Sequence, residues 1–202
     1  WGRVPLWSPT ILSGYPFAAN PLSGLWYPPG WLALLLPLPL SFNLLIGLHL
    51  LLGAVGLTRF LRLEGLSRRA ALLGGLAFAA LPKLYAHYGA GHLTLLYAVP
   101  WTPWLLVSAH RKARRPFRYA GLILALIFLA DPRWAPFAGL LWWGYAFAYS
   151  QFGVQKKLIP LGALSIQTAL ALLLSGPLLL PLLEYVGLST RNQLASADVF
   201  SH

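Results

Sequence analysis

The sequence predicts an all-α membrane protein: a polytopic bundle of about six transmembrane helices with an ordered extracytoplasmic loop and short interfacial helices. Three observations support this. Only 9% of the residues are charged, against about 25% in soluble domains. Apolar runs that approach membrane length alternate with short polar loops. Basic residues cluster in alternate loops, as the positive-inside rule describes for the cytoplasmic side.

Eleven of the 15 lysines and arginines lie in three short loops. They are Arg59, Arg62, Arg68 and Arg69, then Arg111, Lys112, Arg114, Arg115 and Arg118, then Lys156 and Lys157. Each gap between two clusters holds two apolar stretches, which is room for a helical hairpin. The net charge of +11 therefore reflects basic loops that indicate which side of the membrane each loop faces. A nucleic-acid-binding domain is excluded, because no soluble basic surface is left to hold a phosphate backbone.

The chain divides into three regions. Residues 1–40 form an extracytoplasmic loop, rich in Pro, Gly and aromatics, followed by an interfacial helix over 31–40. Pro37 and Pro39 interrupt that helix, and about ten residues are too few to cross a bilayer. Residues 41–186 form the transmembrane domain, and 187–202 begin a further extracytoplasmic segment. Because the chain has no Met and opens without a leader, we expect a piece of a longer plasma-membrane protein with both ends outside.

The expected crossings are about 41–60, 70–88, 93–109, 117–131, 134–150 and 158–176. In the second, Ala71, Gly75 and Ala79 form a row of small residues that lets helices approach closely. Pro100 and Pro103 predict a kink in the third. The fourth is too short for a full bilayer unless the membrane is thinned there or protein surrounds it. A second short helix follows the sixth on the outer face.

Some ionisable residues lie outside the basic loops that orient the helices in the membrane, and these residues gather on the outer side. They are Arg3, Lys83, His87, His92, Asp131, Arg133, Glu184, Arg191 and Asp198. Ionised groups at membrane depth are costly and usually face a protein interior or a water-filled cavity. The distribution predicts a polar cavity that opens to the outer face.

Within this set, Lys83 and His87 are four residues apart and share a helix face. Together they could hold a phosphate or pyrophosphate; the alternative is a lysine that reaches the lipid headgroups. Asp131 beside Arg133 suggests a general base or metal-binding carboxylate next to a phosphate-binding arginine. Its alternative is a helix-end turn with a local ion pair. Glu184 and Arg191 could complete the pocket.

The histidines are weak candidates for metal ligands. His87 and His92 are expected to be hydrogen-bonding loop residues, with metal ligation as the alternative, and we assign no metal ligand because no acid neighbours them. His49, in the first crossing, is expected to form a hydrogen bond between helices, with a proton relay as the alternative. The chain has no Cys, which excludes disulfides and Cys-based metal sites.

Several loop motifs carry a family resemblance. They are PLWSP at 5–9, GYPFAAN at 14–20, YPP at 27–29, the turn from His87 to His92, AVPWTPWLL at 98–106 and LSTR at 188–191. Together they resemble the YfhO-like bacterial membrane proteins, whose first large outer loop has similar elements ahead of an interfacial helix. The likeness spans nearly the whole chain. The loop motifs are more specific than the apolar helices.

The resemblance implies a glycosyltransferase of the GT-C class, which takes sugar from a polyprenyl-phosphate donor on the outer face. The family's usual catalytic acid would precede Trp1, so Asp131 is a second-site candidate. Many relatives carry a Gly-His-Pro-Gln-like turn where this chain has Asp131-Pro132-Arg133-Trp134.

We therefore expect a sugar transferase embedded in the lipid bilayer, with a cell-envelope glycan or lipid as acceptor. Lys83, Arg133 and Arg191 would bind the donor phosphate, with His87 and His92 nearby. Asp131 or Glu184 would activate the acceptor or hold a divalent cation. A lipid or saccharide transporter (flippase) and a non-catalytic scaffold for envelope assembly are the alternatives. The scaffold would be favoured if Asp131 lay more than about 15 Å from both Lys83 and Arg133.

Overall fold

A computed structural model describes residues 4–10, 13–110, 117–152 and 161–188. The described residues form helices joined by turns, and the only β-type pairing among them is an isolated bridge between Ser8 and Tyr15. In order, the elements are η1 (Phe17–Ala19), η2 (Pro28–Leu35), α1 (Leu38–Leu63), α2 (Arg68–Ala79), α3 (Pro82–Gly89), α4 (Leu93–Ala98), η3 (Val99–Trp101), α5 (Thr102–Ala109), α6 (Ala120–Ala130), α7 (Ala135–Phe152), α8 (Leu161–Leu174) and α9 (Gly176–Gly187). The predicted all-α class is confirmed.

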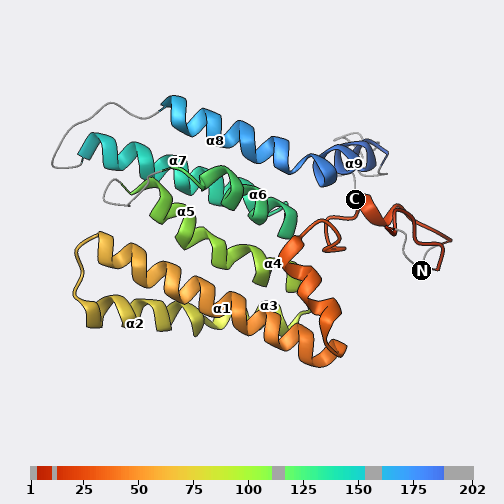
Figure 1. Ribbon diagram of the computed structural model, residues 1–202, viewed down its shortest axis with the longest axis horizontal. Helices are drawn as coiled ribbons and strands as arrows, with labels where there is room; N and C mark the ends of the chain where they lie inside the picture. The colour runs from red at the N-terminus through yellow and green to blue at the C-terminus, as the bar shows by residue number, and fades with distance from the viewer. Residues whose placement is uncertain (1–3, 11–12, 111–116, 153–160, 189–202) are drawn as a thin grey trace, which may run out of the picture.

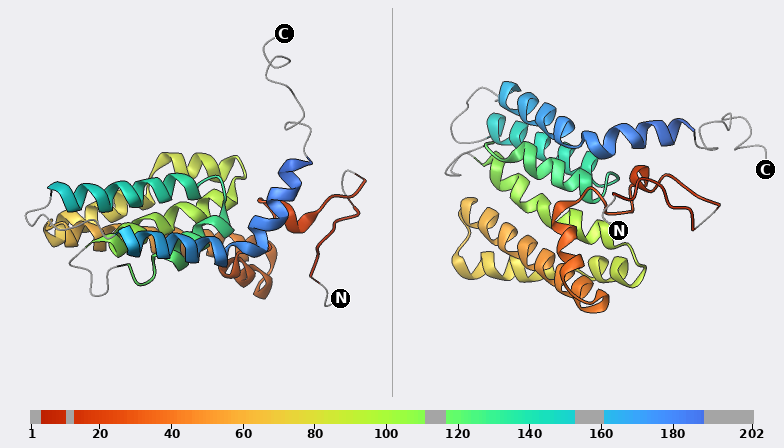
Figure 2. Two further views of the ribbon diagram at one scale, coloured as in Figure 1. Left: turned by 90° about the horizontal axis from the view of Figure 1, so that it is seen from above. Right: turned by 45° about the vertical axis from the view of Figure 1, so that its right-hand side comes forward.

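The helices lie side by side along the long axis of the molecule and reverse direction from one pass to the next (Figure 1). One end, which we call the basic end, contains the α1–α2 turn with Arg62 and Arg68. The opposite end, which we call the loop end, contains the N-terminal loop (residues 4–10 and 13–35), the α6–α7 turn and α9. Both further views show the N-terminal loop and α9 gathered at that end (Figure 2).

Two segments are long and apolar enough to cross a membrane: α1, and α2 with α3 taken together as Arg68–Gly89. A third is possible if α8 and α9, which are bent by 73° at their junction, count as one span. The passes Leu93–Ala109 and Ala120–Ala130 are apolar but shorter. The structure therefore contains two to three candidate membrane helices and supports membrane association.

Prolines define several helix boundaries. A separate interfacial helix over 31–40 was expected, but η2 ends at Leu35 and α1 already begins at Leu38. Pro39 fits in the first turn of α1, where backbone N–H groups have no helical partner and the missing donor costs nothing. The early start lengthens α1 beyond the predicted crossing at about 41–60.

Other prolines interrupt the second and third passes. Pro82 begins α3, after a break at Ala80 and Leu81 that separates it from α2. In the third pass, Pro100 lies in the 3₁₀ segment η3 between α4 and α5, and Pro103 lies in the first turn of α5. The predicted irregularity of the third pass thus takes the form of a short 3₁₀ turn.

The row of small residues in α2 packs closely against α1. Ala71 is fully buried. A Cβ added to Gly75 would lie 2.5 Å from the Ala54 carbonyl oxygen and 2.1 Å from Thr58 Oγ1. Only glycine permits this separation of the two helices, as the sequence pattern predicts.

The short helix α6 lies at the centre of the fold. It contacts α4, α5, α7 and α8, and seven of its residues are buried: Ala120, Gly121, Leu124, Ala125, Ile127, Leu129 and Ala130. Gln167 of α8 accepts a hydrogen bond from the Gly121 N–H at 2.8 Å. A helix that is apolar on all sides belongs in a protein core. Protein therefore covers most of the short fourth pass, although Leu122 remains exposed. Burial in protein was one of the two arrangements expected for this pass.

Candidate functional site

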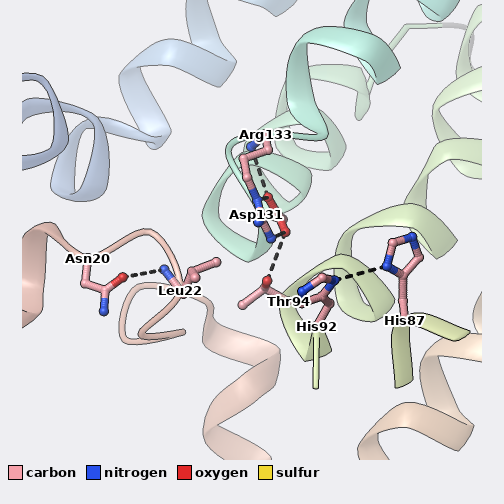
Figure 3. Close-up of polar contacts among 7 residues, drawn as sticks. All are labelled: Asn20, Leu22, His87, His92, Thr94, Asp131 and Arg133. Carbon is pink, nitrogen blue, oxygen red and sulfur yellow. Dashed lines mark hydrogen bonds and ion pairs between the residues drawn. The ribbon is translucent and has the colours of Figure 1, made fainter. Parts of the chain in front are cut away.

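The Asp131–Arg133 turn, between α6 and α7 at the loop end, holds an ion pair. Arg133 Nη2 lies 2.7 Å from Asp131 Oδ2 and Arg133 Nε lies 2.9 Å from Oδ1. The backbone N–H of Arg133 also donates to Oδ1 at 3.0 Å, which closes the turn. From α4, the Thr94 hydroxyl donates to Oδ2 at 2.9 Å. Figure 3 shows this chain of contacts.

Asp131 is fully buried, and four donors occupy its two carboxylate oxygens. A carboxylate has about four acceptor positions, so none is left for a further proton donor. Burial alone raises the pKa of Asp131, but the hydrogen bonds from Arg133 and Thr94 and the guanidinium charge outweigh it and lower the pKa. The turn lies beyond the end of α6, and its carboxylate is ionised at neutral pH.

Arg133, in contrast, is accessible: its side chain is 54% exposed. The guanidinium has five N–H donors and directs two of them at Asp131, so three remain for a ligand. The buried carboxylate fixes the plane of the guanidinium and leaves its other edge open. Such an arginine is suited to bind phosphate or carboxylate through two parallel hydrogen bonds.

A cavity of about 710 Å³ reaches Ala130, the residue before Asp131, and Thr94, which bonds Asp131; Asp131 and Arg133 themselves are not among its lining residues. Its walls come from the N-terminal loop, η2, α1, α4 and the last residue of α6, and they are mainly aromatic and aliphatic. Phe17, Trp26, Trp31, Leu45 and Tyr97 are among the lining residues. Thr94 is one of the few polar ones, and the same residue donates to Asp131.

A buried hydrogen-bond chain holds one wall of the cavity. The His49 Nδ1 lies 2.7 Å from the Leu45 carbonyl oxygen, which requires the proton to be on Nδ1, so Nε2 accepts from the Tyr27 hydroxyl at 2.6 Å. Trp101 Nε1 in turn donates to the Tyr27 hydroxyl oxygen at 2.8 Å. His49 was expected to bond another helix; its partner is instead a loop side chain. Through Tyr27, the N-terminal loop is joined to α1 and η3.

His87 and His92 lie across the turn between α3 and α4, and their Nδ1 atoms are 3.2 Å apart. The backbone N–H of His92 also donates to the His87 carbonyl oxygen at 2.9 Å. Figure 3 shows the two rings facing each other, with His92 between His87 and Thr94 in this view. The expectation of hydrogen-bonding turn histidines is confirmed, and each is the other's partner.

The remaining predicted site residues do not join these contacts. Lys83 on α3 and Glu184 on α9 are exposed, and within the described ranges the side chain of neither makes a hydrogen bond or ion pair. Arg191 lies outside the described residues. Thr94 was not among the predicted site residues. The signal that could have identified it is its place two residues after the His87–His92 turn.

These features define an all-α protein with candidate membrane helices and an apolar cavity next to a half-exposed arginine at one end. No protein-family model, curated protein or solved structure matches the chain. The functional assignment therefore depends on the geometry of the site.

Proposed function

We propose that this chain belongs to a membrane-embedded glycosyltransferase of the GT-C type, which transfers a sugar from a polyprenyl-phosphate donor to a cell-envelope acceptor. The observation that carries the proposal is the double role of Thr94, which lines the apolar cavity and bonds the carboxylate that holds Arg133. A lipid phosphate has an apolar tail and an anionic head, and the site offers a matching surface for each part.

The distribution of charge supports an outer-face site. The α1–α2 turn, which Arg62 and Arg68 flank, lies at the basic end, whereas the α6–α7 and α3–α4 turns lie at the loop end (Figure 1). By the positive-inside rule the basic end faces the cytoplasm. We propose that the chain crosses the plasma membrane about six times, with the loop end outside. The loop motifs shared with YfhO-like proteins favour the same assignment.

In this proposal Arg133 binds the donor phosphate. The acceptor hydroxyl oxygen attacks the anomeric carbon of the sugar while the bond from that carbon to the phosphate oxygen breaks. The leaving polyprenyl phosphate keeps the electron pair, and the acceptor proton passes to a base. Arg133 stabilises the charge that develops on the leaving phosphate, because its open N–H groups are already oriented.

Asp131 then acts as a positioning residue. All its acceptor positions are occupied, which favours holding Arg133 over taking a proton from the acceptor. The acceptor proton would pass to another base, outside the contacts of Asp131, Arg133 and Thr94 described above. Arg191 stays a predicted phosphate ligand.

A transfer assay with labelled sugar on a polyprenyl-phosphate donor tests these roles in the purified protein. We expect Arg133→Gln to raise the donor KM roughly 10- to 100-fold, since hydrogen bonds to charged groups contribute about 1.5–3 kcal/mol. Asp131→Asn should also raise the donor KM, and its kcat should fall by a smaller factor than its KM rises. Arg133→Lys should restore part of the donor affinity, because it keeps the charge without the planar pair of donors.

The matched control is Arg118→Gln, which removes an exposed arginine at the start of α6, away from the loop end. It should leave the donor KM unchanged. A large loss of kcat in Asp131→Asn at unaltered donor KM would assign Asp131 as the base and overturn its positioning role. Absence of turnover with any lipid-linked sugar would reject the transferase and favour the transporter or the scaffold.

Asp131 and Arg133 lie in contact. The wide separation that would favour a scaffold is therefore not found for this pair.

A further inference from the structure

The histidine pair has the geometry of a metal chelate. Two imidazole nitrogens bound to one tetrahedral zinc ion at about 2.0–2.1 Å lie roughly 3.3 Å from each other. The Nδ1 atoms of His87 and His92 are 3.2 Å apart, and the ring centroids are separated by 5.4 Å. The separation of the two nitrogens therefore matches that of two imidazoles bound to one ion, and a small rotation of the rings would direct both at it.

We propose that His87 and His92 form a binding site for a transition-metal ion of the zinc and copper class. Imidazole ligands favour these ions, whereas Mg²⁺ and Ca²⁺ prefer oxygen ligands. The site is therefore distinct from the magnesium or manganese sites that carboxylates provide. The proposal concerns metal binding alone and does not depend on the transferase activity.

The backbone prepares the site in advance. His87 lies in the last turn of α3, and His92 is the residue before α4. Between them, Gly91 adopts φ +74°, a conformation that glycine adopts readily and that reverses the chain. The bond from the His92 N–H to the His87 carbonyl oxygen closes the turn at 2.9 Å. The backbone therefore already has the conformation that brings the two rings together, which lowers the entropy cost of binding one ion.

The site is open to further ligands. Within the described part of the chain, no group of three or more His, Cys, Asp or Glu side chains could enclose an ion. Water or an anion must fill the other coordination positions. The nearby charged side chain on α3 is Lys83, one turn before His87, and a cation there disfavours a bare metal ion. We therefore expect the bound ion to take an anionic oxygen ligand such as phosphate.

Calorimetric titration of the purified, metal-free protein with Zn²⁺ tests the proposal. We expect one bound ion per chain, and loss of that binding in His87→Ala and in His92→Ala. His202→Ala is the matched control, because it removes an imidazole outside this pair, and it should bind as the parent does. Zn²⁺ binding should become tighter when inorganic phosphate is present.

Pulsed electron paramagnetic resonance with Cu²⁺ supplies a second measurement that a folding defect does not imitate. The spectrum should contain two coordinated imidazoles in the parent and one in each single variant that retains bound copper. If the parent binds no Zn²⁺, or if both single variants bind as tightly as the parent, the pair is a hydrogen bond between two neutral rings and the metal site is rejected. Spectra without coordinated imidazole would reject it equally.

Discussion

At the residue scale, the site depends on the carboxylate of Asp131. This group is fully buried and accepts three hydrogen bonds from Arg133 and one from Thr94 on α4. The α6–α7 turn is thereby joined to α4, and the guanidinium of Arg133 is held in one orientation.

The Asp131–Arg133 pair predicts a pH-dependent stability. The folded-state pKa of Asp131 lies below its ordinary value of 3.8, so the carboxylate stabilises the fold above about that pH. The contribution is lost as pH falls through the lower folded-state value. Thermal unfolding in detergent from pH 7 to pH 3 should therefore show Asp131→Asn less stable than the parent by about 1–3 kcal/mol near neutrality. The difference should shrink at the acidic end.

Glu184→Gln is the control for that experiment, because Glu184 is exposed and makes no ion pair among the described residues. It should unfold like the parent across the range. A stability difference for Asp131→Asn that grows towards low pH would contradict the lowered pKa.

At the scale of the elements, helix boundaries follow proline chemistry and packing more than apolar length. Five helices, α1, α3, α5, α7 and α9, have Pro among their first two residues, where the missing N–H costs little. The sequence indicated the apolar stretches correctly but placed the start of the first one late. The small-residue row in α2 was predictive, because close approach of two helices requires specific residue types.

Gly75 provides a test of that approach. A methyl group there meets the backbone of α1 at Ala54, which has little freedom to move. Gly75→Ala should therefore destabilise the protein by about 1–3 kcal/mol, as expected for an overpacked interface. The measurement is the thermal midpoint in detergent, followed by tryptophan fluorescence.

The control is Gly47→Ala in α1, where an added Cβ meets no atom within 4 Å. This change should be neutral or stabilising by up to about 1 kcal/mol, because Ala favours the helix over Gly. Equal midpoints for the two variants would show that α1 and α2 are not in close contact at Gly75.

At the scale of the whole molecule, composition and apolar runs were enough to predict the all-α class, but they could not predict the cavity. Its walls come from the N-terminal loop, η2, α1, α4 and α6, so it exists only where these segments converge. Lys83 and Glu184 were predicted to share a pocket with Asp131, and the structure places each on an exposed helix surface instead. Sidedness of charge could be inferred from sequence, but contact between side chains could not.

The orientation of the molecule gives the last prediction. The chain has no Cys, so single cysteines report their position without background labelling. Ala90 and Leu66 are exposed residues in turns, Ala90 at the loop end and Leu66 at the basic end. In intact cells a membrane-impermeant maleimide should label Ala90→Cys, because the loop end faces outwards. Leu66→Cys should react only after the membrane is permeabilised, since a basic turn stays in the cytoplasm.

Labelling of Leu66→Cys in intact cells would show that the protein has the opposite orientation in the membrane. The cavity and Arg133 would then face the cytoplasm, where a donor presented on the outer face could not reach them.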